Sequence, residues 1–157
     1  MDPDVTLHLL DHTNASRLDG ATVFDGPVRL EALAPFLADP GHLLIFATVG
    51  DTVAGFASGV VMYHPDKAPM LFVSEVGVDE PFRRRGIAKA LTGALLEQAR
   101  TLGCEGIWVA TEADNTPAQK LYESLAARRT DGIVVYDWDG AMDAPRPASA
   151  SAPARPA

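Results

Sequence analysis

The chain has 157 residues, 47% of them apolar, which is enough for one globular domain with its own core. Its 21 Asp and Glu residues outnumber the 13 Lys and Arg, and the net charge of −8 argues against nucleic acid as the main partner while it is compatible with a cationic substrate. No apolar run approaches the roughly 20 residues of a membrane span, and the first residues lack the basic start of a signal peptide, so a cytoplasmic protein is expected. Cys104 is the single cysteine, so no intrachain disulfide is expected.

Apolar periodicity predicts an alternation of short strands and helices. In chain order we expect a strand from Val5 (VTLHLL), helical segments at 15–24 and 28–39, strands at 42–49, 52–63 and 70–78, a helix at 86–103, a strand at 106–111, a helix at 116–126 and a last strand at 131–139. The helix at 86–103 is the clearest, because Ile87, Leu91 and Leu95 share one face and Gly103 ends it. For the helix at 116–126 we expect Thr116 as the N-cap, with Gln119 completing a capping box.

This order of elements predicts an α+β domain around a central mixed sheet. We expect the domain to span residues 3–141. Residues 142–157 are rich in Ala, Pro and Ser and cannot form a core, so a disordered tail is expected there.

Three arginines, Arg83, Arg84 and Arg85, stand directly before Gly86 and the clearest helix. The first amides of a helix lack partners within it and lie at the positive end of the helix dipole, so this junction suits an anion. Gly86 lets a ligand approach the backbone, Ala88 keeps the next contact small, and arginine side chains add charge-assisted bonds to phosphate. An arginine triplet alone would also be explained by a solvated basic turn. The strand before it and the glycine and helix after it favour a phosphate-bearing ligand.

The segment RRRGIA, Arg83 to Ala88, resembles the [Q/R]-x-x-G-x-[G/A] acetyl-coenzyme A signature of the GNAT N-acetyltransferases. The resemblance extends over the strand FVSEVGV, the long helix, GIWVAT and NTPAQKLY. It implies a mostly antiparallel central sheet, flanked by helices and splayed between strands four and five. It also implies that acetyl-coenzyme A binds here, with the amides from Arg84 to Lys89 on its pyrophosphate. The residues implied to bind this cosubstrate are Val76, Gly77, Val78, Arg83, Arg84, Arg85, Gly86, Ile87, Ala88, Lys89 and Asn115.

Within that family the chain most resembles the type I aminoglycoside 3-N-acetyltransferases. These have an acidic residue at the position of Glu75, an Arg-Arg-x-Gly-Ile-Ala loop, a Leu-Gly turn after the long helix and a Pro-Ala-x-x-Leu-Tyr segment. The chain departs from that group in having Glu75 where Asp is usual, and its TEADNT segment matches the group's acidic loop poorly.

Acetyl transfer to an amine needs a base for the ammonium, donors for the oxyanion and a proton for the departing thiolate. Glu75 lies in an apolar strand, where alternation puts it on the face of Leu71 and Val73. A structural hydrogen bond or salt bridge would explain it, but the resemblance favours a general base or an anchor for the substrate ammonium. Tyr122 lies on the apolar face of its helix with Leu121, as a core tyrosine would. The resemblance implies that it protonates the thiolate of coenzyme A.

The other candidates follow the fifth strand. The resemblance places Asn115 on the pantetheine arm, with a turn or capping role as the alternative. Glu112 and Asp114 are candidates for binding substrate ammonium groups, with solvated loop acids as the alternative. His64 and Asp66 lie on an expected long loop between strands three and four that could border the acceptor site, although a plain turn explains them as well. The four histidines show no metal-ligand spacing, so no metal is expected.

We therefore expect an acetyl-coenzyme A-dependent N-acetyltransferase that uses direct attack by a primary amine. The expected acceptor is the 3-amino group of an aminoglycoside such as gentamicin, which would make the protein an antibiotic-resistance enzyme. A GNAT acting on another small amine, an amino acid or a protein amine is the first alternative. A catalytically silent module that binds acyl-coenzyme A is the second. No nucleic acid or membrane partner is expected, and a homodimer stays open.

Overall fold

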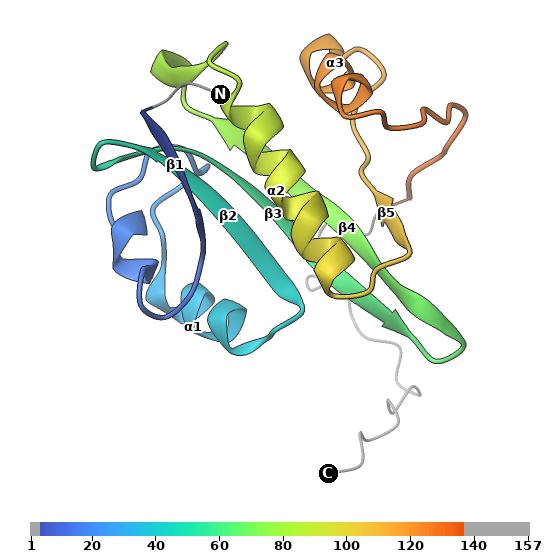
Figure 1. Ribbon diagram of the computed structural model, residues 1–157, viewed down its shortest axis with the longest axis horizontal. Helices are drawn as coiled ribbons and strands as arrows, with labels where there is room; N and C mark the ends of the chain where they lie inside the picture. The colour runs from blue at the N-terminus through green and yellow to red at the C-terminus, as the bar shows by residue number, and fades with distance from the viewer. Residues whose placement is uncertain (1–3, 137–157) are drawn as a thin grey trace, which may run out of the picture. The chain divides into compact units, whose positions relative to one another are not determined.

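The computed structural model describes residues 4–136 and divides the chain into two compact units, Met1–Ala127 and Arg128–Ala157. All helices and strands of the described residues lie in the first unit (Figure 1). In chain order they are β1 (Val5–Leu9), η1 (Ala15–Leu18, a 3-10 helix), α1 (Leu30–Ala38), β2 (His42–Val49), β3 (Thr52–His64), β4 (Lys67–Val78), η2 (Glu80–Phe82, a 3-10 helix), α2 (Ile87–Thr101), β5 (Gly106–Trp108) and α3 (Thr116–Ser124). None of the helices in residues 4–136 combines the length and apolarity that a membrane span requires.

The strands form one sheet whose order is the order of the sequence, β1-β2-β3-β4-β5. Neighbours from β1 to β4 are antiparallel, whereas β4 and β5 are parallel and are connected through α2. The expected mixed, mostly antiparallel sheet is thus confirmed. The expected long loop between strands three and four is wrong, because β3 and β4 extend to a tight hairpin in which His64 pairs with Lys67.

Each face of the sheet carries its own core. On one face Ile87, Leu91, Leu95 and Ala99 of α2 are buried against alternate residues of the strands, and Figure 1 shows α2 lying across this face. The other face carries a smaller core, which consists of Leu18, Leu44, Phe46, Val53 and Phe56. Phe24, in the segment before α1, and Phe36 of α1 pack against this core. In β2 the odd-numbered Leu43 and Ile45 belong to the first core and the even-numbered Leu44 and Phe46 to the second, as the two-residue period of a strand requires.

The pairing of β4 with β5 ends early. It runs from Met70–Gly106 to Phe72–Trp108, although β4 continues to Val78. Beyond Phe72, no strand of the described residues pairs with this edge of β4, and Figure 1 shows β5 diverging from it. The expected splay between strands four and five is confirmed, and it leaves backbone groups of β4 available to a ligand.

A β-bulge in β4 changes the face on which Glu75 lies. Val73 pairs with Gly59 and Glu75 with Ser58, so Ser74 is an extra residue on β4. Before the bulge, Val73 belongs to the core under α2; after it, Val76 packs on the same core. Glu75 therefore lies on the opposite face. The expectation that simple alternation places it with Leu71 and Val73 is wrong, because one inserted residue reverses the alternation.

Three predicted elements differ from the structure. The helical segment at 15–24 is reduced to η1, because Gly20 adopts a φ of 72° that ends any helix there. The strand at 106–111 stops at Trp108. For the strand at 131–139, residues 131–136 have no regular secondary structure, and Ile133 to Tyr136 are 70–80% exposed. Residues 137–139 and the predicted tail at 142–157 lie outside the described residues.

Candidate active site

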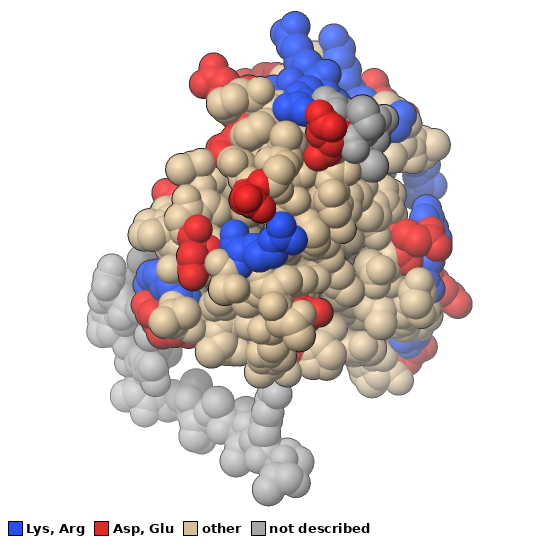
Figure 2. Space-filling view, turned by 60° about the vertical axis from the view of Figure 1, so that its left-hand side comes forward, with Lys and Arg blue, Asp and Glu red and all other residues tan. Residues whose placement is uncertain are grey.

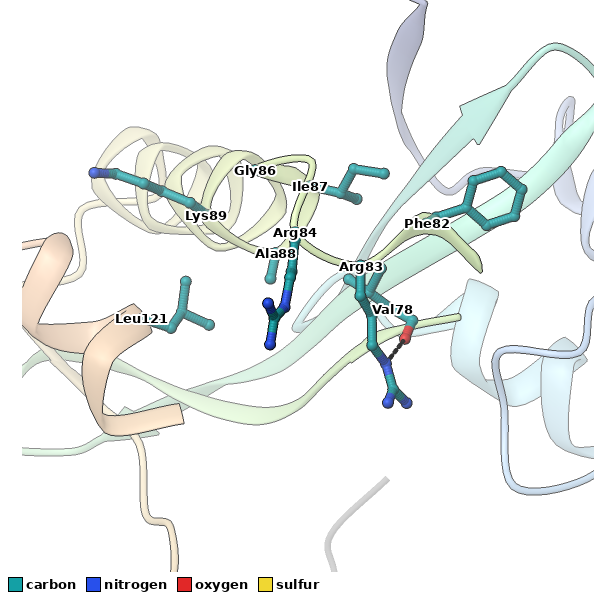
Figure 3. Close-up of a pocket in the computed structure, with 9 residues that line it drawn as sticks. All are labelled: Val78, Phe82, Arg83, Arg84, Gly86, Ile87, Ala88, Lys89 and Leu121. Atoms are coloured by element: carbon teal, nitrogen blue, oxygen red, sulfur yellow. Dashed lines mark hydrogen bonds between the residues drawn. The ribbon is translucent and has the colours of Figure 1, made fainter. Parts of the chain in front are cut away.

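A cavity of about 230 Å³ lies at the amino end of α2. Figure 3 shows its lining, which comes from the end of β4, the loop before α2, the first turn of α2 and one residue of α3. The lining residues are Val78, Phe82, Arg83, Arg84, Gly86, Ile87, Ala88, Lys89 and Leu121. Seven of these nine are among the residues expected from the sequence to bind acetyl-coenzyme A, and Phe82 and Leu121 are added by the structure.

The backbone at this cavity is shaped for close contact with an anion. Gly86 is the N-cap of α2 with φ 78° and ψ 5°, and a Cβ built on it would meet no atom within 4 Å. The first bond of the helix runs from Ala90 N to Gly86 O at 3.1 Å, so the amides of Ile87 to Lys89 have no acceptor within the helix. Arg84 has a φ of 63°, a conformation that non-glycine residues rarely adopt and that is found at ligand-binding loops. Open space beside free amides fits a pyrophosphate.

The three arginines do not play equal parts. Arg83 donates from Nε to the carbonyl oxygen of Val78 at 3.1 Å, and this bond ties the loop to the end of β4 (Figure 3). The side chain of Arg84 extends between Arg83 and Leu121, away from α2 (Figure 3). Arg85 lies over the ring of Phe82, 5.7 Å from its centroid, and does not line the cavity. In the space-filling view, the largest group of Lys and Arg side chains is at the top, while Asp and Glu are scattered (Figure 2).

Glu75 lies in the part of β4 that β5 does not cover. It pairs across the ladder with Ser58 and is exposed to solvent on one side. Partial burial of the carboxyl raises its pKa, and the negative charge of Asp25 raises it further. A carboxyl with a raised pKa is a stronger base when it is ionised, which suits the removal of a proton from an ammonium group.

Tyr122 and Asn115 both belong to α3. Tyr122 is half-buried, and burial raises the pKa of its hydroxyl. The hydroxyl is protonated at neutral pH, as in any tyrosine, and has a proton to donate. Asn115, rather than Thr116, is the N-cap: its Oδ1 accepts from the amide of Ala118 at 3.2 Å. The Gln119 side chain donates to the carbonyl oxygen of Ala113 at 2.7 Å instead of closing a capping box on Thr116. The capping role uses the Asn115 oxygen and leaves its Nδ2 group as a donor.

The remaining candidates are on the surface. Glu112 and Asp114 are both exposed; Glu112 accepts a 3.4 Å bond from the hydroxyl of its neighbour Thr111. His64 contacts Asp66 at the turn of the β3–β4 hairpin, which agrees with the structural alternative for these two residues. Cys104 is half-buried, and burial raises the pKa of its thiol, which argues against a nucleophilic role. Among residues 4–136, no three His, Cys, Asp or Glu side chains are grouped as metal ligands.

The irregular segment that lies along the end of β4 was not predicted from the sequence. Residues 21–27 have no regular secondary structure, and Asp25, within this segment, was not singled out. The turn signals Asp19-Gly20 and Asp25-Gly26-Pro27 could have indicated an irregular segment instead of a helix. No pattern in the sequence links this segment to β4.

The fold and the cavity at the amino end of α2 define an acyltransferase, and the chain belongs to the acetyltransferase (GNAT) family, whose model matches residues 10–127. It is 30% identical over 123 residues to an aminoglycoside N(6')-acetyltransferase type 1 of Salmonella typhimurium (strain LT2), covering 75% of this chain and 79% of that protein. It is 37% identical over 98 residues to a mycothiol acetyltransferase of Saccharopolyspora erythraea, covering 62% of this chain and 31% of that protein. Among solved structures, AAC(6')-Iy in complex with the bisubstrate analogue CoA-S-monomethyl-acetylneamine has a TM-score of 0.71 at 23% identity, covering 85% of this chain and 97% of that chain.

The chain is therefore an N-acetyltransferase that uses acetyl-coenzyme A as its acetyl donor. The predicted family, fold and cosubstrate are confirmed. The finer resemblance to the 3-N type is corrected, because the aminoglycoside acetyltransferases named above are of the 6' type.

Proposed function

We propose that the protein acetylates an aminoglycoside on its 6'-amino group. The observation that carries this proposal is the 30% identity over 123 residues with the aminoglycoside N(6')-acetyltransferase, which extends through most of both chains. The exposed carboxylates of Glu75, Glu112 and Asp114 supply the negative charge that an acceptor with several ammonium groups requires.

The donor would be held by groups of three elements, α2, β4 and the N-cap of α3. The amides of Ile87, Ala88 and Lys89 face open space at the start of α2, and the Arg84 side chain, which lines the same cavity, adds positive charge to it. The uncovered edge of β4 from Val76 to Val78 offers backbone groups to the amides of the pantetheine arm. Asn115 has its Nδ2 group left for the same arm once its oxygen has capped α3. These features support the predicted donor-binding residues other than Arg85, whose side chain lies over Phe82 outside the cavity.

In the reaction that we propose, Glu75 accepts a proton from the acceptor ammonium, directly or through a water molecule. The free amine forms a bond to the acetyl carbonyl carbon, and the bond from that carbon to sulfur breaks. The nitrogen, which then carries one proton more than the amide product, loses that proton to solvent. Tyr122 donates its proton to the departing thiolate and recovers one from solvent. The raised pKa of Glu75 makes the ionised carboxylate a stronger base. The hydroxyl of Tyr122 is protonated at neutral pH and so has a proton for the thiolate.

The test is a thiol-release assay with acetyl-coenzyme A and a panel of aminoglycosides, polyamines, amino acids and peptides. Cys104 is the only protein thiol, so an enzyme blank without acceptor corrects its contribution. Products are weighed by mass spectrometry, and the acetylated nitrogen is located by two-dimensional NMR. We expect one added acetyl group, on the 6' nitrogen of an aminoglycoside.

The panel separates the alternatives. Acetylation of an amino acid or a simple polyamine, with aminoglycosides unmodified, would show that the acceptor class is wrong. Acetylation of an aminoglycoside at another nitrogen would overturn only the regiochemistry. Binding of acetyl-coenzyme A without turnover on any amine would favour a silent binding module.

A further inference from the structure

The irregular segment at residues 21–27 lies along β4. Thr22 donates from its hydroxyl to Oδ2 of Asp79, just beyond the end of β4, at 2.6 Å. The carbonyl oxygen of Val23 is 3.5 Å from the position that a Cβ on Gly77 would occupy. Residue 22 is near residue 79 and residue 23 is near residue 77, so the segment runs antiparallel to the end of β4.

A ring contact fixes the same segment to β3. Phe24 packs on Phe56 with ring centroids 4.5 Å apart, and Phe56 is directly opposite Gly77 in the ladder. Gly77 leaves the room for this arrangement, since its Cβ would lie 2.9 Å from Cε1 of Phe56. Three successive residues, Thr22 to Phe24, are thus held in place, and the next residue is Asp25.

The position of Asp25 relative to Glu75 follows from the course of this segment along β4. Because of the bulge at Ser74, Glu75 lies on the same face of β4 as Gly77, which is the face that the segment covers. Without the bulge, Glu75 would face the core under α2 and could not meet Asp25. An antiparallel course that continues beyond 23–77 would bring Asp25 opposite Glu75, and the negative charge of Asp25 raises the pKa of the Glu75 carboxyl.

We propose that Asp25 is a positioning residue that acts through Glu75: the segment 22–25, anchored at Thr22 and Phe24, holds a second carboxylate on the face of β4 where Glu75 lies. Ser58, opposite Glu75 on β3, is neutral, and Asp79 at the far end of the segment accepts the bond from Thr22. Among the described residues, Asp25 is the charged group that acts on Glu75. The role of Glu75 as base rests on the proposed function; the effect of Asp25 on its ionisation does not.

The first measurement needs no acceptor. The Glu75 carboxyl is titrated by carbon-13 NMR in protein labelled at glutamate, with its signal assigned from Glu75→Gln. Asp25→Asn should lower the pKa of Glu75, because one of the two causes that raise it is removed. Asp51→Asn is the matched control: it removes the same charge from the exposed turn between β2 and β3 and should leave the titration unchanged.

Anchoring is tested separately from charge. Thr22→Val removes the bond to Asp79 but keeps Asp25, and should also lower the pKa of Glu75, whereas Thr22→Ser keeps the hydroxyl and should restore the wild-type titration. An unchanged Glu75 titration in Asp25→Asn would overturn the proposal, whatever the protein acetylates. An effect of Thr22→Val that Thr22→Ser fails to restore would refute the part played by the anchor.

The second measurement is the pH dependence of kcat and kcat/KM, with whichever amine the protein acetylates. Asp25→Asn should move the acid limb of the kcat/KM profile to lower pH and reduce kcat on the plateau by a factor of about two to five, as expected for one exposed charge interaction. In a Glu75→Gln background, Asp25→Asn should reduce kcat no further. A full further reduction in that background would show that Asp25 does not act through Glu75. Absence of turnover in the wild type would count against the proposed function and leave the NMR result decisive for Asp25.

Discussion

Replacing Gly86 by valine should weaken binding of coenzyme A in addition to a modest loss of stability. Gly86 has a φ of 78°, and a left-handed conformation costs a non-glycine residue about 1–2 kcal/mol. Its added Cβ would meet no protein atom within 4 Å, so packing adds nothing to that cost. For a domain of this size we expect the Tm to fall by roughly 2–8 °C.

The same side chain would project into the space beside the free amides of α2. Losing one charge-assisted hydrogen bond to the pyrophosphate costs about 1.5–3 kcal/mol, which is a rise of roughly tenfold to a hundredfold in the Kd for coenzyme A. Titration calorimetry with coenzyme A, well below the Tm of the variant, measures this directly.

Gly103 provides a matched control at the other end of the same helix. It has a φ of 77°, and a Cβ there would also meet no atom within 4 Å. Gly103→Val should therefore lower the Tm by a similar amount and leave the Kd for coenzyme A unchanged. Equal Kd values in the two variants would refute the assignment of the α2 amino end to the pyrophosphate.

Glu75→Gln should reduce kcat while the Kd for coenzyme A stays unchanged, and the acid limb of kcat/KM, which in the wild type lies above the ordinary glutamate range, should disappear. A raised pKa means that the folded state holds the proton more tightly than the unfolded state, so ionisation of Glu75 lowers the free energy of unfolding as pH rises. The Tm of Glu75→Gln at neutral pH should therefore not fall. A fall in Tm would point to a structural role for Glu75. Tyr122→Phe should reduce kcat by roughly tenfold to a thousandfold with a normal Kd for coenzyme A, and wild-type turnover would mean that solvent protonates the thiolate. Deletion of the residues after Asp143, measured by Tm and kcat, should change neither, because that composition cannot form a core; a Tm lowered by more than a few degrees would contradict it.

The parts of the fold that the sequence predicted well are those in which one periodicity runs without interruption. Helix α2 has Ile87, Leu91 and Leu95 on one face, and the structure buries all three. The start of α2 directly after Gly86 was predictable for the same reason, because the helical periodicity begins at the residue after this glycine.

The parts that were missed depend on contacts between distant segments. The bulge in β4 reverses the face of Glu75, and its signal was two polar residues, Ser74 and Glu75, between Val73 and Val76, where alternation allows only one. The run from Ile133 to Tyr136 has strong β-propensity, but a strand also needs a partner for its backbone, and propensity does not supply one.

Helix α1 contains no buried residue, lacks a side-chain cap and includes Pro35, which has no amide hydrogen to bond the preceding turn. Helix α2, by contrast, buries four apolar residues completely or nearly so. The free energy needed to open α1 is therefore much smaller than the free energy needed to unfold the domain. In native-state hydrogen exchange, the amides of α1 should exchange through local opening at rates that low concentrations of denaturant hardly change, while those in the middle of α2 should exchange only through global unfolding.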